Sequence, residues 1–307
     1  MKELNMKSIL LLLLTVLVIG CSNMNTHKNY REAHIENYFQ GDNVNMAEAI
    51  FNEDTDEITR LVKQEGYDVN TRDSIERGVW TYQWTYLNYA VTKGKRTSVK
   101  TLLALGADID KLLLIGEGRS NLNIAAGHCD QAMIKLLLDH NIKMDHIIAP
   151  SPLRDLMIND CYSEELFDLL IEHGTDVNHP FYVSGTTPLM TAYAINEHDA
   201  IDYLLSRGAD PLQIDTFGNS FASLLQRNID DGKRLDTAQK YKQRLIKDYG
   251  IQYPVEVSYR KGIEQSIRRY ENTTAREKQF LGASEIERVN EMKDSLVTGV
   301  YNDIAID

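Results

Sequence analysis

Apolar residues in this 307-residue chain gather in short runs, and a polar phrase of five residues follows five of these runs. Glycine or asparagine comes first in the phrase, and aspartate or lysine comes third. The copies are Gly66–Asn70, Gly106–Asp110, Asn141–Asp145, Gly174–Asn178 and Gly208–Leu212. Their first residues lie 40, 35, 33 and 34 positions apart. A nearly fixed period in this range predicts stacked repeats, in which no unit buries its apolar face alone, and it favours binding over catalysis.

A second motif stands upstream of each phrase, and its fullest copy is Thr187-Pro-Leu189. Threonine or serine is suited to cap a helix, and proline to the first helical position. The next helix carries an apolar triplet such as Ile134, Leu137 and Leu138, and glycine ends it in a left-handed turn. The copies are Thr85–Ala90, Ser120–Ala125, Ser151–Leu156, Thr187–Ala192 and Asn219–Leu224. This arrangement resembles the ankyrin repeat, whose signature is Thr-Pro-Leu-His-x-Ala.

The resemblance covers residues 45–227, in which residues 45–66 form an N-terminal unit with a shortened start. It implies an all-α ankyrin-repeat solenoid of about five to six repeats with β-turn fingers. None of the copies has the histidine that the signature places fourth, so the stack is divergent.

Residues 228–307 carry helical patterns but lack the phrase. Leu235–Tyr249 and Gly262–Tyr270 are predicted helices, and Thr274–Glu277 and Ser284–Glu287 resemble capping boxes that begin two more. A repeat stack needs a polar terminal unit to stay soluble. We therefore interpret this region as a C-terminal helical cap, with contact to a partner as the alternative.

Residues 1–20 have the composition of a secretory signal, because lysines precede an apolar run that is too short to span a bilayer comfortably. Val18-Ile-Gly-Cys21 resembles the bacterial lipobox. That resemblance implies cleavage before Cys21 and a diacylglycerol on its sulfur, followed by a polar tether up to residue 44. Serine follows Cys21, which favours the outer membrane, with the body in the periplasm. An ordinary signal peptide or an uncleaved anchor is the alternative.

Acidic residues outnumber basic residues, 45 to 33, and removal of residues 1–20 changes the formal net charge from −12 to −13. Nucleic acids and anionic lipids require a basic surface, so we expect neither as a partner. The membrane would be reached through the lipid anchor alone. The charge suits a basic protein partner, and we expect a monomer before that partner binds.

Cys129 and Cys161 are the cysteines that remain after Cys21, and they occupy equivalent places in successive repeats. Neighbouring helix layers lie about 8–10 Å apart, whereas a disulfide needs Cα atoms within about 7 Å. A bridge would form only if the two loops lean together, and we interpret both side chains as unpaired.

The sequence shows no catalytic motif. Its eight histidines are scattered, and it contains no His-Glu-x-x-His, Cys-x-x-Cys, Gly-x-Ser-x-Gly or phosphate-binding loop. Asp130 and Glu164 stand where second helices begin, a place where negative charge favours the helix dipole. We therefore expect no enzyme activity, no cofactor and no metal.

The ankyrin resemblance implies that fingers and first helices line a concave face that binds proteins. The longest interval enlarges the first finger, and strict alternation over Val79–Tyr86 predicts an extended hairpin arm. Both tryptophans lie in this arm, where they either anchor a partner or pack on the stack. The candidate partner-binding residues are Trp80, Tyr82, Trp84, Tyr86, Glu117, Arg119, Phe181, Tyr182 and Phe217.

Lipid-anchored ankyrin proteins resemble the immunity partners of antibacterial lipase effectors of the type VI secretion system. That resemblance implies a non-catalytic lipoprotein whose concave face and arm cover the active-site mouth or the membrane-binding surface of a lipase-type toxin. A scaffold for a resident envelope protein is one alternative. An enzyme with an unrecognised site in the C-terminal region is another.

Overall fold

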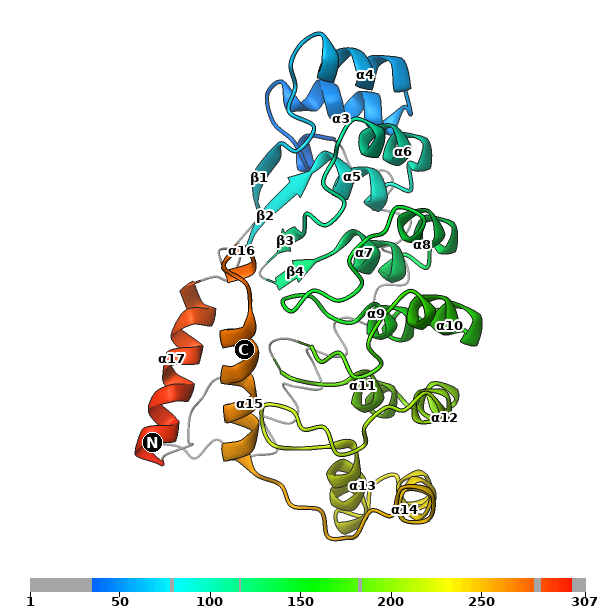
Figure 1. Cartoon of the computed structure of the whole chain (residues 1–307), viewed down its shortest axis with the longest axis vertical. Coiled ribbons are helices and arrows are strands. Elements are labelled where there is room, and N and C mark those ends of the chain that lie inside the picture. Colours follow the sequence, from blue (N-terminus) through cyan, green and yellow to red (C-terminus); the bar gives the residue numbers. More distant parts are fainter. Residues whose placement is uncertain (1–34, 78–79, 116, 182–183, 279–282, 300–307) are drawn as a thin grey trace.

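A computed structural model describes residues 35–77, 80–115, 117–181, 184–278 and 283–299. Within these residues, six consecutive helix pairs stack into a column, with loops and strands projecting from one side (Figure 1). The pairs are α3 (Asn43–Phe51) with α4 (Thr55–Lys63), α5 (Tyr86–Thr92) with α6 (Arg96–Ala104), α7 (Asn121–Gly127) with α8 (Gln131–Leu138), α9 (Pro152–Ile158) with α10 (Glu164–Glu172), α11 (Pro188–Ile195) with α12 (His198–Ser206), and α13 (Phe221–Asp230) with α14 (Leu235–Tyr249). We call the first helix of each pair the inner helix, because it lies nearer the projecting loops, which we call the fingers.

Inner helices α5, α7, α9 and α11 begin where the upstream motif predicts, and α13 begins one residue later, after Ser220. Thr85, Ser120, Thr187 and Ser220 each accept a hydrogen bond from the backbone N–H three residues later, which satisfies one of the unpaired donors at a helix start. Both helices of each pair contribute apolar side chains to the core. Ile134, Leu137 and their equivalents are buried in one continuous core that runs from the first pair to the last.

Asparagine at the fourth place of the motif connects successive inner helices. The Asn88 amide donates to the Asn121 side chain at 2.9 Å, and the Asn123 amide donates to the Asp155 carboxylate at 2.9 Å. Both amides also donate to a backbone carbonyl of the loop that follows. The missing histidine is thus replaced by a group that bridges neighbouring repeats.

The fifth residue of the polar phrase connects the bases of successive fingers. Its side-chain oxygen accepts a hydrogen bond from the backbone N–H of the third residue of the next phrase. The four bonds join Asn70 to Asp108, Asp110 to Lys143, Asp145 to Asp176 and Asn178 to Asp210, at 2.7, 2.8, 2.7 and 2.7 Å. We call these four bonds the inter-repeat ladder. Leu212 has no side-chain acceptor at the corresponding place of the last phrase.

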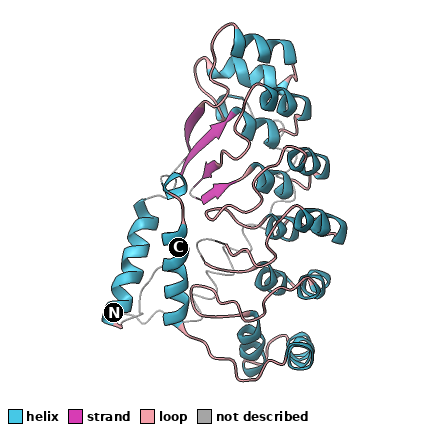
Figure 2. Ribbon diagram, in the orientation of Figure 1, coloured by secondary structure: helices cyan, strands magenta, loops and turns pink. Residues whose placement is uncertain are grey.

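The first two fingers form a four-stranded antiparallel sheet, so the fold is not purely helical as predicted (Figure 2). Its strands, in spatial order, are β1 (Arg72–Arg77), β2 (Trp80–Thr85), β3 (Leu113–Ile115) and β4 (Glu117–Arg119). The β1–β2 hairpin is the predicted arm. Tyr82 lies opposite Ile75 on one side and Ile115 on the other, so the long first finger reaches far enough to pair with the second.

The residues just before the first repeat are part of the core and not of a tether that extends to residue 44. After the short helix η1 (Ile35–Asn37), Tyr38 and Phe39 are almost fully buried. Their rings meet Tyr89 of α5 at centroid distances of 5.1 and 5.4 Å. The sequence analysis assigned these two aromatic residues to a polar tether, because two residues alone form no periodic apolar pattern.

The C-terminal helices do not extend the column. α14 has the predicted bounds and packs on α13 as the outer helix of the sixth pair, so residue 227 lies inside a repeat helix. α15 (Tyr259–Asn272), α16 (Ala275–Lys278) and α17 (Ala283–Thr298) then run back beside the fingers (Figure 1). The chain thus covers the fingers with its own helices, which the prediction of a simple end cap did not anticipate.

Two faces of α15 make the contacts that place it beside the fingers. Ile263 and Ile267 pack with Met292 and Leu296 of α17. On the other face, Gly262 lies so close to a finger that a Cβ atom there would come within 2.4 Å of the Thr216 carbonyl oxygen. Glycine is therefore required at this position for the helix to meet the finger backbone.

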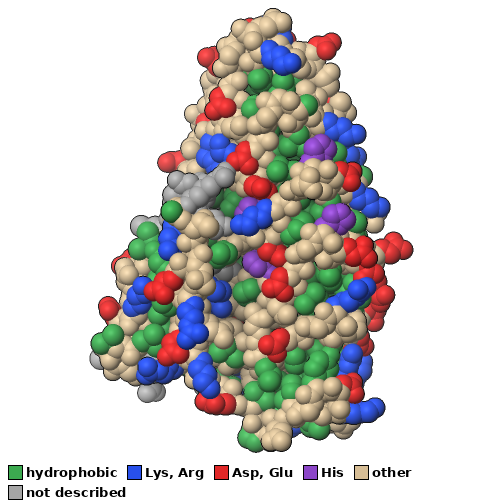
Figure 3. Space-filling model, in the orientation of Figure 1, with side chains coloured by type: hydrophobic (Ala, Val, Ile, Leu, Met, Phe, Trp, Pro, Cys, Tyr) green, Lys and Arg blue, Asp and Glu red, His purple; other side chains and the backbone are tan. Residues whose placement is uncertain are grey.

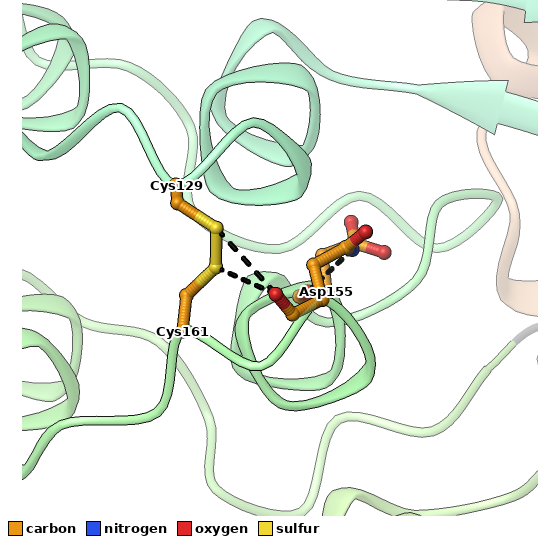
Figure 4. The surroundings of a disulfide bond; sticks show 4 residues. Cys129, Asp155 and Cys161 are labelled. Carbon is orange, nitrogen blue, oxygen red and sulfur yellow. Dashed lines mark hydrogen bonds between the residues drawn. A yellow bond between two sulfur atoms is a disulfide. The ribbon is translucent and has the colours of Figure 1, made fainter. Parts of the chain in front are cut away.

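Cys129 and Cys161 form a disulfide, with Cα atoms 5.8 Å apart, so their prediction as unpaired side chains was wrong (Figure 4). Each follows an inner helix, α7 or α9, and Cys129 adopts a left-handed backbone with φ of 56°. Both sulfur atoms lie beside the carbonyl oxygen of Asn159, at 3.6 and 3.0 Å. The turns of these two repeats lie closer together than the average spacing between helix layers suggests.

Replacement of Asn178 with alanine tests the inter-repeat ladder. The backbone N–H of Asp210 would lose its acceptor, so we expect the free energy of unfolding to fall by about 1 kcal/mol. Urea denaturation followed by circular dichroism measures the change. Leu212→Ala is the matched control, because this exposed residue accepts no such bond, and its effect should stay within about 0.5 kcal/mol. Equal effects of the two substitutions would contradict a stabilising ladder.

Reduction tests the contribution of the disulfide. The two cysteines are 32 positions apart, and closure of a loop of that length stabilises a fold by about 3–4 kcal/mol in the chain-entropy description. We expect the double variant Cys129→Ser, Cys161→Ser to unfold at lower urea concentration, and reductant to shift the native protein but not the variant. An identical shift of both proteins would show that the reductant acts elsewhere.

Candidate partner interface

The finger side of the column carries a mixture of charges. Figure 3 shows acidic, basic and histidine side chains along the boundary between the C-terminal helices and the repeats. Part of the finger surface is closed by contacts within the chain. Thr216 bonds to Ser266 of α15 at 2.8 Å, and Arg269 of α15 reaches the same Thr216 hydroxyl at 3.2 Å.

Two of the predicted partner-binding aromatics belong to the core. Trp84 is 4 % exposed and meets the Tyr38 ring edge-on at 4.8 Å. Tyr86 is fully buried and donates a hydrogen bond to Asn43 at 2.6 Å. These two residues attach the arm to the stack, so neither is available as a partner anchor.

The other residues of the first two fingers are placed as follows. Tyr82 is partly buried in the sheet and packs against the core. Trp80 begins β2 opposite Arg77, and Glu117 begins β4 opposite Ile115. Tyr182 and Cys21 lie outside the described residues.

Phe217 is at the tip of the last finger, where a helix of the same chain meets it. Its ring lies 6.0 Å from Tyr259 of α15 in an edge-to-face arrangement. Aromatic pairs of this geometry stabilise a fold beyond the area that they bury. Phe217 therefore contacts the C-terminal helices, and its role in partner binding stays a prediction.

Arg119 and Phe181, which lie 62 positions apart in the sequence, each contact a residue of inner helix α9. Arg119 is the last residue of β4 in the second finger, and its guanidinium lies 3.1 Å from the carboxylate of Asp155 on α9. Arg154, also on α9, lies 3.6 Å from the same carboxylate oxygen and 4.8 Å from the centre of the Phe181 ring. We call Arg119, Arg154, Asp155 and Phe181 the arginine cluster.

Asp155 holds the arginine cluster in place. Its side chain is completely buried, and a buried carboxylate needs opposite charges and hydrogen bonds to offset the loss of water. The Asn123 amide donates a hydrogen bond to one carboxylate oxygen, and the two guanidinium groups form ion pairs with the other. The Arg119 guanidinium also lies near the end of α7, where a Cβ atom on Gly127 would be 3.4 Å from its terminal nitrogen.

The sequence pointed to two members of this cluster and missed the other two. Arg154 and Asp155 stand at the fourth and fifth places of the motif. The other copies carry asparagine, methionine or alanine at the fourth place and an uncharged residue at the fifth. This pair of charges at a buried position is the signal that could have found them. The sequence alone does not show that this charged pair contacts Arg119 and Phe181, because only the tertiary structure brings them together.

An open hollow of about 430 Å3 lies on the opposite surface, between the outer helices α10 and α12. Tyr162, Tyr203 and the acidic residues Glu164, Asp199 and Asp202 line it. Burial, with nearby negative charge, raises the pKa of Tyr162 to about 12, so this phenol is protonated at neutral pH and unsuited to act as a base. The described residues include no group of three or more His, Cys, Asp or Glu suited to hold a metal ion.

Two family models match the chain, and both describe ankyrin repeats. One, for three copies, matches residues 46–148, and the other, for one copy, matches residues 184–216. No curated protein shows significant similarity to the chain. None of the helices in the described ranges has the length and apolarity needed to cross a membrane. The chain thus contains ankyrin repeats, which suggest interaction with another protein and are typically non-catalytic.

Replacement of Trp84 with alanine distinguishes packing from partner binding. Because the side chain is buried against Tyr38, we expect the free energy of unfolding to fall by about 3 kcal/mol in urea denaturation. Thr81→Ala, at an exposed position of the same strand, is the control and should change stability by less than about 0.5 kcal/mol. Unchanged stability of the Trp84 variant would return this residue to the set of candidate anchors.

Proposed function

We propose that this chain is a lipid-anchored envelope protein that binds another protein on the finger-facing side of its inner helices. The arginine cluster is the observation that carries the proposal. It places two arginines and an aromatic ring, residue types that are frequent among binding hot spots, at a partly exposed position on inner helix and finger. The C-terminal helices meanwhile pack on fingers along the column, through Tyr270 at the second and third fingers and Gly262 at the last, whereas the arginine cluster stays partly exposed.

The anchor in this proposal is Cys21. Its support is the segment Val18-Ile-Gly-Cys21 at the end of a short apolar run. The disulfide between Cys129 and Cys161 is consistent with this location, because disulfides persist in oxidising compartments such as the bacterial periplasm and are rare in the cytosol. We therefore propose an outer-membrane lipoprotein whose body faces the periplasm.

The specific role that we propose is immunity against an antibacterial effector of the lipase type, delivered by a type VI secretion system. It rests on the resemblance between lipid-anchored ankyrin proteins and such immunity partners. Neutralisation would be steric: the repeat surface covers the mouth or the membrane-binding surface of the toxin, and no chemistry is needed. The net charge of −12 would speed the capture of a basic effector.

A scaffold for a resident envelope protein would use the same surface, and the neighbouring gene separates the two roles. An exported lipase or another toxin beside this gene favours immunity. An enzyme in the C-terminal region is less well supported, because α15 and α17 pack their apolar faces on each other and the second face of α15 on the fingers.

Direct binding tests the proposal. The mature chain with Cys21→Ser is purified, and its affinity for the product of the neighbouring gene is measured by calorimetry. We expect submicromolar binding that blocks the activity of the toxin. Phe181→Ala should weaken binding by more than about 2 kcal/mol if the ring is an anchor.

Arg207→Gln is the control, because Arg207 pairs with Asp168 on the outer helices, away from the fingers. It should bind like the wild type. Absence of association at micromolar concentration would rule out immunity against this product, and equal losses in both variants would place the interface elsewhere.

A further inference from the structure

We infer that the finger surface beneath α15 is a helix-binding site, and that a basic helix of the partner displaces α15 from it. The inference rests on the proposed protein-binding role and names the surface and the kind of ligand. Figure 1 shows α15 running along the fingers. A segment of the same chain thus fills this site before a partner binds, and its contacts show what the fingers hold.

α15 contacts four successive fingers. Tyr270 packs against Leu112 of the second finger and Ile148 of the third. The Arg269 guanidinium lies against the fourth finger, where a Cβ atom on Gly185 would be 2.6 Å from its terminal nitrogen. The first turn of α15 meets the fifth and last finger. The site is therefore shared between repeats and accommodates a helix of 14 residues.

Glycine on both sides makes the contact with the last finger a close fit between backbones. A Cβ atom on Gly262 would lie 2.4 Å from the Thr216 carbonyl oxygen. One on Gly218 would lie 2.2 Å from the carbonyl oxygen of Ser258, the residue that precedes α15. The hydroxyl groups of Thr216 and Ser266 lie 2.8 Å apart in a hydrogen bond. This finger therefore selects a helix that presents glycine and rejects one with a larger side chain there.

The apolar side chains of α15 pack on α17 and not on the core of the stack. Ile263 and Ile267 form a cluster with Met292 and Leu296, separate from the core that runs through the helix pairs. Burial of apolar surface is the dominant attraction between packed helices in water. The two C-terminal helices can therefore leave the fingers together, while they and the stack each keep their own apolar contacts.

α15 is a basic helix on an acidic chain. Its formal net charge is +2, whereas that of the whole chain is −12. The charged residues of α15 are Arg260, Lys261, Glu264, Arg268, Arg269 and Glu271. The field of an acidic chain attracts any basic helix at long range, whether it is α15 or a helix of the partner. The ligand that replaces α15 is therefore a helix of positive net charge with glycine where it meets the last finger.

Displacement of α15 would also extend the surface next to the arginine cluster. Gly185, beside which the Arg269 guanidinium lies, belongs to the same finger as Phe181 and donates its N–H to the Phe181 carbonyl oxygen at 2.7 Å. A partner helix on the fingers would thus lie near the proposed anchor ring. Because α15 competes for the site, the apparent affinity for a partner falls with the fraction of molecules in which α15 is docked.

The test uses the sequence of α15 itself as the ligand. The mature chain with Cys21→Ser and Gly262→Val should release α15, because a valine side chain has no room beside the finger backbone. This 15N-labelled chain is titrated with a synthetic peptide of residues 257–273, and the backbone amides of Thr216 and Gly218 are followed by NMR. We expect saturable shifts with a Kd of about 0.1–1 mM. The peptide that itself carries Gly262→Val should cause none.

Two further chains keep α15 docked. Gln265→Val is the matched control, because Gln265 is exposed on α15 and its replacement leaves the finger contact intact. In Thr216→Cys with Ser266→Cys, a disulfide at the place of the hydroxyl pair fixes α15 to the last finger, and mass spectrometry confirms the cross-link. The Gln265→Val chain should bind the peptide about tenfold more weakly than the Gly262→Val chain, and the cross-linked chain should not bind it.

Hydrogen exchange shows whether Gly262→Val acts on α15 alone. We expect the amides of α15 to exchange about tenfold faster in this variant than in the parent chain, while the amides of α7 and α9 keep their rates. Equal acceleration of all three helices would mean that α15 unfolds only with the stack, and the inference would be wrong.

Failure of the peptide to bind the Gly262→Val chain, or equal binding to the cross-linked chain, would overturn the inference whatever the neighbouring gene encodes. If the product of that gene binds, the cross-link should weaken its affinity by about tenfold, and an unchanged affinity would refute displacement of α15. Peptide binding without binding of the product would leave the helix site standing and refute the proposed partner.

Discussion

The hydrogen bond from the backbone of one finger to the side chain of the finger before it sets the geometry on which the rest of this protein depends. The acceptor is always the fifth residue of the polar phrase, and the donor is always the N–H of the third residue of the next phrase. Such bonds hold successive fingers in register, whereas apolar packing alone is non-directional. The column can therefore carry sites that are shared between repeats.

The arginine cluster is such a shared site. Arg119 comes from the second finger, Asp155 from the fourth inner helix and Phe181 from the fourth finger, so no single repeat could build it. Its buried aspartate would be costly in isolation, and it is tolerated because neighbouring repeats supply the Arg119 guanidinium and the Asn123 amide, while Arg154 of the same helix supplies a second guanidinium. The disulfide lies beside the same two repeats and closes the turns at the ends of their inner helices.

The C-terminal helices cover part of the finger surface that a repeat stack would otherwise leave open. Here a helix of the same chain lies against finger tips, with glycine at the point of closest approach and an aromatic pair beside it. At the other end of the column, the N-terminal residues Tyr38 and Phe39 pack on Tyr89 and so cover inner helix α5. Both chain ends thus reduce the open surface, and α15 also packs on the second and third fingers, where Tyr270 lies against Leu112 and Ile148.

Local pattern was enough to determine the helix pairs, the position of the caps and the hairpin arm. Period and capping residues act over a few positions, so they can be read from neighbours in the chain. The sequence also marked Arg119 and Phe181 as candidates, but it could not connect them. Which aromatic residues are buried, that the two cysteines meet, that α15 covers the fingers and that Asp155 gathers two arginines were decided by the tertiary structure alone. Each of these depends on residues about 30 or more positions apart, and stacking brings such residues together without leaving a mark in the local pattern.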